Sequence, residues 1–159
     1  MPATYSAEHF TSRERNLYVE FDVTTTDSTV ADLGQAFGST DNLISLSQHG
    51  GLQRFYAALF KTVGTGNTDE FSIIAATDAA GTGSPTVVVQ IATAVAQTQN
   101  AIGDFLVLEC DIEQIREALP TATHVGVRLE PATNTDEWVI HAKATYAHAF
   151  TGLTANFIQ

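Results

Sequence analysis

Apolar and polar residues alternate along several stretches of the chain. Residues 17–23 carry an apolar side chain at every odd position, and residues 124–130 repeat the pattern. Residues 138–150 begin with Trp138, and most of their even-numbered positions are apolar. Because successive side chains of a strand point to opposite faces, each stretch predicts a strand with one face in a core.

Three further strands are predicted from composition. Residues 43–47 form a short strand, and residues 86–96 are rich in β-branched side chains, which favour strands. Residues 105–110 are almost continuously apolar. A run of this kind predicts a strand that is buried on both faces, near the middle of a sheet.

Residues 52–61 fit both a helical stripe and a strand. The stretch is followed by the turn-rich sequence of residues 64–69, which leads into an apolar segment at 71–77 and favours a strand for 52–61. A second turn-rich segment, 78–85, follows. We expect the strands at 52–61, 71–77 and 86–96 to form an antiparallel meander.

The best helix signal covers residues 111–119. Asp111 stands at the N-cap position with Gln114 three residues later, and Pro120 follows the last apolar residue. This is the arrangement of a capping box and a helix stop. About eight strands and one short helix predict an all-β protein, an antiparallel β-sandwich or jelly roll. Residues 1–16 are expected to form an extended N-terminal arm, and residues 17–159 one domain.

Charge and composition narrow the classes of partner. The 159 residues include 18 acidic and 7 basic side chains, for a net charge of −11, so binding to nucleic acid or to an anionic membrane is disfavoured. Only 16% of the residues are charged, with 22 threonines and 22 alanines. A surface with so little charge suits contact with other protein. Residues 1–10 show no secretory signal, and the apolar stretches are too short to span a bilayer.

Residues that carry chemistry are present without the spacing that chemistry needs. His141 and His148 are seven apart, which places them on opposite faces of a regular strand, and His9 and His49 lie in irregular segments. We therefore expect no metal site. The single cysteine, Cys110, excludes an internal disulfide and is expected to be a buried small residue in a protein made in a reducing compartment.

Carboxylate pairs at Glu20 with Asp22 and at Glu109 with Asp111 share a strand face and have the separation of a glycosidase pair. Acidic residues at every second strand position are, however, typical of a solvated face, and Asp111 is explained as a helix cap. No catalytic residue is predicted.

The loops also lack a cofactor motif. The pairs Gly64-x-Gly66 and Gly81-x-Gly83 lack the continuation of a phosphate-binding loop and are interpreted as hairpin turns. Asp69, Glu70 and Asp78 border loops without the spacing of a calcium loop. No cofactor is expected.

Aromatic side chains suggest one alternative. Tyr18, Tyr56, Trp138 and Tyr146 could stack on sugar rings, as in a carbohydrate-binding sandwich. Trp138 belongs to the even-numbered set of its strand, which favours a place in the core.

Four segments resemble head decoration and related virion proteins of tailed bacteriophages: FSIIAATDAAGTGSPTVVVQ, GDFLVLECDIEQI, THVGVRLEPATNTDEWVIHAKATYAHA and TGLTAN. The resemblance spans roughly residues 71–156. It implies a capsid cement without enzymatic activity, a β-domain that is often trimeric and bridges subunits of the major capsid protein. Such a protein would reside on the capsid surface of the virion, and in the host cytoplasm during assembly. A tail or neck protein, or an enzyme using a carboxylate pair, are the alternatives.

The N-terminal arm is a candidate segment for contact with the major capsid protein. It carries Tyr5, Phe10, Arg13 and Arg15, and aromatic residues and arginine are enriched at interface centres. These four residues are the predicted partner-binding residues.

Overall fold

The computed structural model describes residues 14–22, 29–31, 33, 42–47, 51–63, 68–91, 105–131 and 137–146. Nearly all of the regular structure in these residues is β-strand. The elements in chain order are β1 (Glu14–Asp22), β2 (Thr29–Val30), β3 (Ile44–Ser45), β4 (Leu52–Val63), β5 (Thr68–Ala76), β6 (Thr86–Ile91), β7 (Phe105–Asp111), α3 (Ile112–Ala118), β8 (His124–Pro131) and β9 (Glu137–Tyr146).

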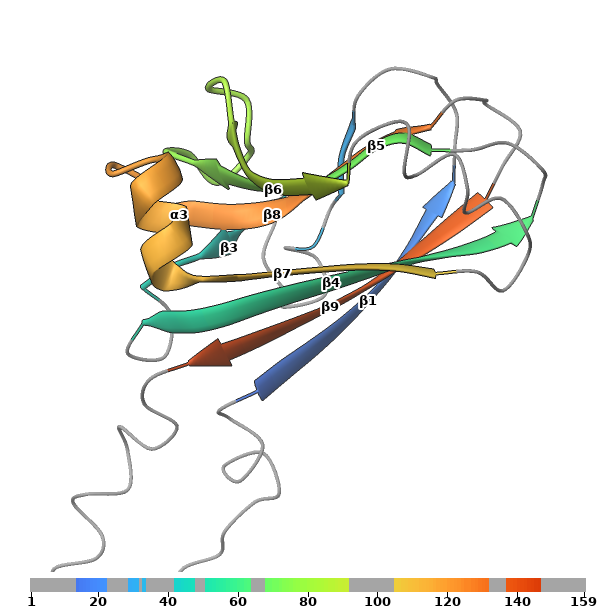
Figure 1. The fold of residues 1–159 in the computed structure, drawn as a ribbon, viewed down its shortest axis with the longest axis horizontal. Coiled ribbons are helices and arrows are strands. Elements are labelled where there is room, and N and C mark those ends of the chain that lie inside the picture. Colours follow the sequence, from blue (N-terminus) through green and yellow to red (C-terminus); the bar gives the residue numbers. More distant parts are fainter. Residues whose placement is uncertain are drawn as a thin grey trace, which may run out of the picture.

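The described strands form two antiparallel sheets that pack face to face, as Figure 1 shows. One is a four-stranded sheet in the order β1-β9-β4-β7. The other is a five-stranded sheet in the order β2-β8-β5-β6, in which β3 also pairs with β8. The predicted all-β sandwich with one short helix is confirmed.

The strand pairing is that of one long hairpin folded over on itself. β5 and β6 form the tip, and outward from it β4 pairs with β7, β2 with β8 and β1 with β9, each pair antiparallel. Folding this hairpin divides the strands between the two sheets in the order given above. Leaving out the short β3, this is the eight-stranded arrangement of a jelly roll.

The core lies between the sheets and is made by alternate residues of each strand. Trp138 is 2% exposed, which confirms that it is a core residue. Lys61 stands opposite Trp138 in the β4–β9 register, is itself 2% exposed, and places its Nζ 4.8 Å from the centre of the indole ring. A cation over an aromatic face is an attractive arrangement, and it keeps the lysine charge in contact with a partner inside the core. Other fully buried residues of the core include Phe55, Leu59, Phe71, Ile73, Val125, Val127, Leu129 and Ile140.

Helix α3 closes one end of the sandwich beside β6 and β7 (Figure 1). The Asp111 carboxylate accepts a hydrogen bond from the Gln114 backbone N–H at 2.8 Å, and the Gln114 side chain accepts one from the Asp111 N–H at 3.0 Å. The predicted capping box is therefore confirmed. Ile115 is fully buried against the core, and Pro120 follows the end of the helix.

Three details of the sequence prediction were wrong. β4 and β5 lie in different sheets, so the expected meander is reduced to the hairpin of β5 and β6. β7 is an edge strand and not a central one, and its Val107 is 54% exposed. β1 begins at Glu14, so Glu14–Asn16 are strand residues and not part of the arm.

The outer face of the five-stranded sheet is covered by the chain itself. Leu43 lies on this face with Ile74 and Ala76, and all three are buried. Gly126 makes the close approach possible, because a Cβ atom there would lie 2.1 Å from Leu43 Cδ2. On its other side Leu43 packs against Gly81, where a Cβ atom would lie 3.1 Å from Leu43 Cδ1. The two glycines thus hold the leucine between the sheet and the 78–84 loop.

Candidate protein-binding face

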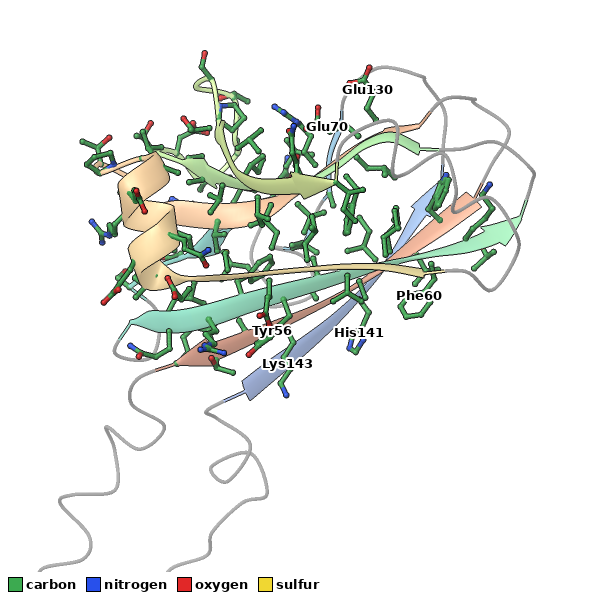
Figure 2. All side chains as sticks on the ribbon, in the orientation of Figure 1. Tyr56, Phe60, Glu70, Glu130, His141 and Lys143 are labelled. Carbon is green, nitrogen blue, oxygen red and sulfur yellow. The ribbon has the colours of Figure 1, made fainter. Side chains whose placement is uncertain are left out.

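The outward side chains of β4, β7 and β9 form one continuous surface on the four-stranded sheet. Figure 2 shows Tyr56, Phe60, His141 and Lys143 projecting from the same side of this sheet, away from the other sheet. We call this surface the β4–β7–β9 face. Its members are Arg54, Tyr56, Ala58, Phe60, Thr62, Val107, Glu109, Val139, His141, Lys143 and Thr145; Val139 is buried, at 5% exposed, and the others are half-buried or exposed.

Strand register orders these side chains into rows across the sheet. Tyr56 lies between Lys143 and Glu109. In the next row Ala58 lies between His141 and Val107. Residues directly opposite each other on antiparallel strands are in side-chain contact range, so each row acts as one unit of the surface.

The chemistry of the face changes from one end to the other. At the end near α3, Arg54 interacts with Tyr56 and Glu109. Its hydrogen bond with Tyr56 is the main cause that raises the pKa of the guanidinium, and the charge of Glu109 contributes less. At the other end Phe60 is opposite Val139, one row beyond Ala58 and Val107. An apolar end beside a polar, charged end is the composition of an interface core with its rim.

The apolar end is also hollowed. Phe60, Thr62, Val139 and His141 line a shallow depression of about 390 Å³. Ala58 has a small side chain, which rises less above the sheet than the larger side chains of Tyr56 and Phe60 on either side of it. A partner side chain inserted there would be held among aromatic and aliphatic groups, which is the setting in which interface anchors contribute most.

The two outer sheet faces therefore differ. The five-stranded sheet carries Leu43 and the 78–84 loop over its centre, which buries Ile74 and Ala76. On the β4–β7–β9 face, Val107 remains 54% exposed, and it is the large hydrophobic side chain found exposed among the residues whose burial the structure describes. On β4 the half-buried Tyr56 and Phe60 lie in the rows on either side of Val107, and a contiguous apolar patch of this kind suits protein contact.

The two candidate carboxylate pairs lie on different strands of the four-stranded sheet. Glu109 is exposed on the β4–β7–β9 face, whereas Asp111 is engaged in capping α3. The described backbone places Glu20 and Asp22 in β1, opposite Val139 and Glu137. His124 and His141 lie in different sheets, while His9, His49 and His148 fall outside the described residues.

Two of the loop acids, Asp78 and Glu70, have structural partners. The Asp78 carboxylate accepts backbone N–H bonds from Ala80, Thr82 and Gly83 at 2.9 to 3.1 Å. These bonds, led by those from Thr82 and Gly83, lower the pKa of Asp78. The carboxylate thus organises the loop that contains Gly81-x-Gly83. The Gly64-x-Gly66 segment lies outside the described residues.

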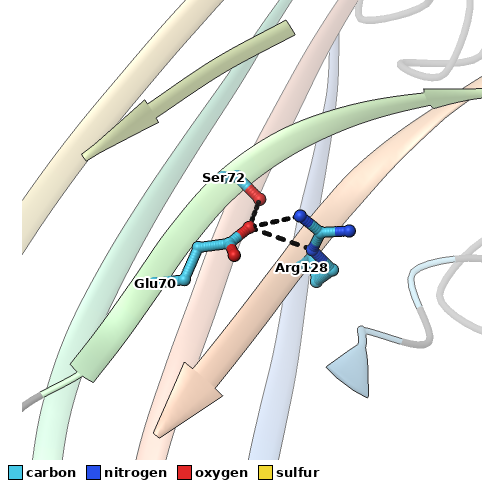
Figure 3. Close-up of polar contacts among 3 residues, drawn as sticks. All are labelled: Glu70, Ser72 and Arg128. Carbon is cyan, nitrogen blue, oxygen red and sulfur yellow. Dashed lines mark hydrogen bonds and ion pairs between the residues drawn. The ribbon is translucent and has the colours of Figure 1, made fainter. Parts of the chain in front are cut away.

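Glu70 forms an ion pair with Arg128 across β5 and β8, shown in Figure 3. Its Oε1 accepts hydrogen bonds from Arg128 Nη2 at 2.6 Å, Arg128 Nε at 2.9 Å and the Ser72 hydroxyl at 2.6 Å. Both charged side chains are 21% exposed. Within the residues that the structure describes, no group of three or more histidine, cysteine or acidic side chains could hold a metal ion.

Cys110 is buried, as predicted, and burial raises the pKa of its thiol to about 12. Of the aromatic candidates for sugar stacking, Trp138 and Tyr146 are each 2% exposed, which leaves Tyr56 on a surface. Tyr18 has its backbone in β1, opposite His141. Among the described helical residues, no segment is long and apolar enough to cross a membrane.

The predicted partner-binding residues fall largely beyond the part of the chain that is described. Tyr5, Phe10 and Arg13 lie outside the described residues, and Arg15 lies in β1 opposite Ala144. The low charge of the chain predicted contact through strand faces in general but did not single out the β4–β7–β9 face. Its signal was present in the outward set of residues 52–61, where Tyr56, Ala58 and Phe60 replace the polar residues of an ordinary solvated strand face.

Neither the family models nor the curated proteins contain a match to this chain.

Proposed function

We propose that this protein is a virion structural protein, a decoration or cement protein that binds the lattice of major capsid subunits and stabilises the head. It acts by protein contact and not by catalysis. The observation that carries the proposal is the difference between the two outer sheet faces: one is covered by Leu43, and the other exposes Val107 beside aromatic side chains.

The β4–β7–β9 face supplies the two properties that a lattice contact needs. Its apolar end, with Phe60, Val107 and the depression beside Val139, offers area that gains free energy when water is removed. Its charged end, with Arg54, Glu109 and Lys143, sets the orientation of the partner through charge complementarity. A stable contact buries roughly 800 Å² on each partner.

Repetition on a lattice strengthens such a contact. We propose a symmetric oligomer, with a trimer favoured, in which each copy engages a neighbouring capsid subunit. Several weak contacts made at once are retained far more tightly than any one of them, because the later contacts form within an already bound complex. Residues 1–13, which include Tyr5, Phe10 and Arg13, are proposed as a second contact segment.

The fold is one that virion proteins use. Jelly rolls form viral capsid domains and lectin domains, so the architecture fits both the virion proposal and the carbohydrate-binding alternative. The burial of Trp138 and Tyr146 removes two of the aromatic platforms that the alternative needs. The resemblance of residues 71–156 to tailed-phage decoration proteins favours the capsid as the partner. It also implies location on the virion surface, and in the host cytoplasm during assembly.

The proposal is tested by sedimentation of the purified protein with isolated heads and, in a separate arm, with isolated tails. We expect a stable oligomer in analytical ultracentrifugation and co-sedimentation with heads. Retention on tails alone would replace the head role by a tail or neck role. A monomer that co-sediments with neither particle, or that binds a glycan on an array, would overturn the proposal.

A further inference from the structure

A groove opens at the end of the sandwich where α3, β3 and the start of β8 meet, the end that carries the helix in Figure 1. Its volume is about 650 Å³, within the range of roughly 300–1,000 Å³ for small-ligand sites. The described lining residues are Ser45, Leu46, Ser47, Gly51, Arg116, Thr121, Ala122, Thr123 and His124.

The strands fix the walls of this groove. Ser45 stands opposite His124 in the β3–β8 register, and Leu46 donates its backbone N–H to the Thr123 carbonyl at 2.9 Å. Thr123 in turn donates its N–H to Ala76 at 2.9 Å, which ties the groove to β5. Leu46 and Ala122 are buried and form an apolar floor. The groove is therefore built on sheet pairing and not on a free loop alone.

Hydrogen-bond donors are concentrated in the groove. The Ser45 and Ser47 hydroxyls lie 3.0 Å apart, and the Thr123 hydroxyl lies 2.8 Å from His124 Nδ1. Arg116, in the last turn of α3, uses Nη1 in a long 3.4 Å hydrogen bond to the Pro120 carbonyl. A guanidinium has five N–H groups, so this bond holds the side chain at the groove and leaves a pair of parallel donors for a ligand.

The charge of the groove is opposite to that of the protein. The chain carries 18 acidic side chains against 7 basic ones, yet no carboxylate is found among the described lining residues and one guanidinium is. The other basic side chains whose contacts are described are engaged elsewhere: Arg128 with Glu70, Lys61 with Trp138 and Arg54 with Tyr56. Arg116 has no acidic partner in the described residues.

We propose that this groove is a second binding site that takes a carboxylate, presented by an acidic peptide segment. Arg116 pairs with the two carboxylate oxygens through its parallel N–H groups, a geometry that the guanidinium fork matches. The Ser45, Ser47 and Thr121 hydroxyls bind the peptide groups on either side. One guanidinium balances one carboxylate, whereas a phosphate dianion would leave a charge without a partner.

The test is a titration of the full chain followed by backbone amide NMR, at physiological ionic strength. The probe is a blocked tetra-aspartate peptide, and its matched control is the blocked tetra-asparagine peptide. Arg116→Gln removes the proposed anchor, and Arg54→Gln removes an exposed arginine of equal charge from the β4–β7–β9 face. A third arm uses inorganic phosphate. Unchanged amide spectra away from each substitution establish that both variants are folded.

We expect tetra-aspartate to move the amides of Thr121, Thr123 and His124, and tetra-asparagine to leave them in place. Arg116→Gln should weaken the binding about tenfold or more, as for loss of a hydrogen-bonded charge, and Arg54→Gln should leave it unchanged. The inference is overturned if tetra-aspartate moves none of these amides, if tetra-asparagine moves them equally, or if Arg116→Gln has no effect. Tighter binding of phosphate at the same amides would also overturn the assignment to a carboxylate. None of these outcomes bears on the capsid role, which depends on the opposite sheet.

Discussion

The contact between Gly126 and Leu43 gives the sharpest stability prediction. A methyl group at position 126 would lie 2.1 Å from Leu43 Cδ2 and 3.4 Å from Leu43 Cγ. The leucine cannot turn away freely, because its Cδ1 already packs against Gly81 at 3.1 Å from an ideal Cβ position. Gly126 lies opposite Ile74 in the β5–β8 register, so Gly126→Ala forces Leu43 off the sheet or displaces β8.

The expected cost follows from two opposing effects. Overpacking of a buried contact costs about 1–3 kcal/mol in the free energy of unfolding. Replacing glycine by alanine restricts the unfolded chain and returns about 0.4–1 kcal/mol where the backbone conformation is compatible. Gly126 is not among the glycines with positive φ, so this second effect applies. We expect a net destabilisation of about 1–1.5 kcal/mol, or roughly 2–6 °C in Tm for a chain of this length.

Urea denaturation of four proteins measures this prediction: wild type, Gly126→Ala, Leu43→Ala and the double variant, all at one protein concentration. Leu43→Ala removes the clash partner, so Gly126→Ala in that background should be neutral or stabilising by up to about 1 kcal/mol. This change of sign is the decisive feature. The reasoning is refuted if Gly126→Ala lowers the free energy of unfolding as much in the Leu43→Ala background as in the wild type. The destabilisation would then not come from the contact between position 126 and Leu43.

Three further predictions concern the described polar groups. Glu70→Gln leaves Arg128 partly buried without a full charge partner and should cost about 1–3 kcal/mol by urea denaturation; a cost equal to that of an exposed substitution would contradict the network. Because the folded pKa of Asp78 is lowered, its contribution to stability is present above pH 3.8, its ordinary value, and is lost as the pH falls through the folded value. Wild type should therefore lose more stability than Asp78→Asn between pH 6 and pH 3 (a chosen test range, about three units); equal losses would refute the role of the carboxylate. Since the pKa of Cys110 is raised to about 12, the thiol should react with a disulfide reagent at neutral pH only on unfolding, and rapid labelling of the native protein would contradict its burial.

Local patterns predicted the elements of this fold well. The alternation at 124–130 corresponds to β8, with Val125, Val127 and Leu129 fully buried, and the capping box formed at Asp111 as expected. The ambiguous 52–61 stretch is a strand, β4. These features depend on contacts between neighbours in sequence or on one face of one strand, which a period of two or a spacing of three reveals.

Pairing between distant strands was not predictable in the same way. β4 and β5 are joined by a turn-rich segment that resembles a hairpin loop, yet they do not pair with each other. β4 pairs with β7 and β9, and β5 pairs with β6 and β8. The apolar run of β7 was assigned to the middle of a sheet, although it lies at an edge. Val107 makes the run continuous because it faces outward on a surface that is itself apolar, so the same residue that misled the prediction now marks the candidate site. The groove at Arg116 and the cover formed by Leu43 arise only when segments far apart in sequence meet.

The claim that the β4–β7–β9 face binds the capsid is tested most directly by one pair of variants in the head co-sedimentation assay. Val107→Glu adds a charge to the apolar end of that face, and Gln90→Glu adds the same charge to an exposed position of β6 in the other sheet. Both should fold, because both positions are exposed. We expect Val107→Glu to lose most of its retention on heads and Gln90→Glu to sediment like wild type. Equal retention of the two variants would contradict the account.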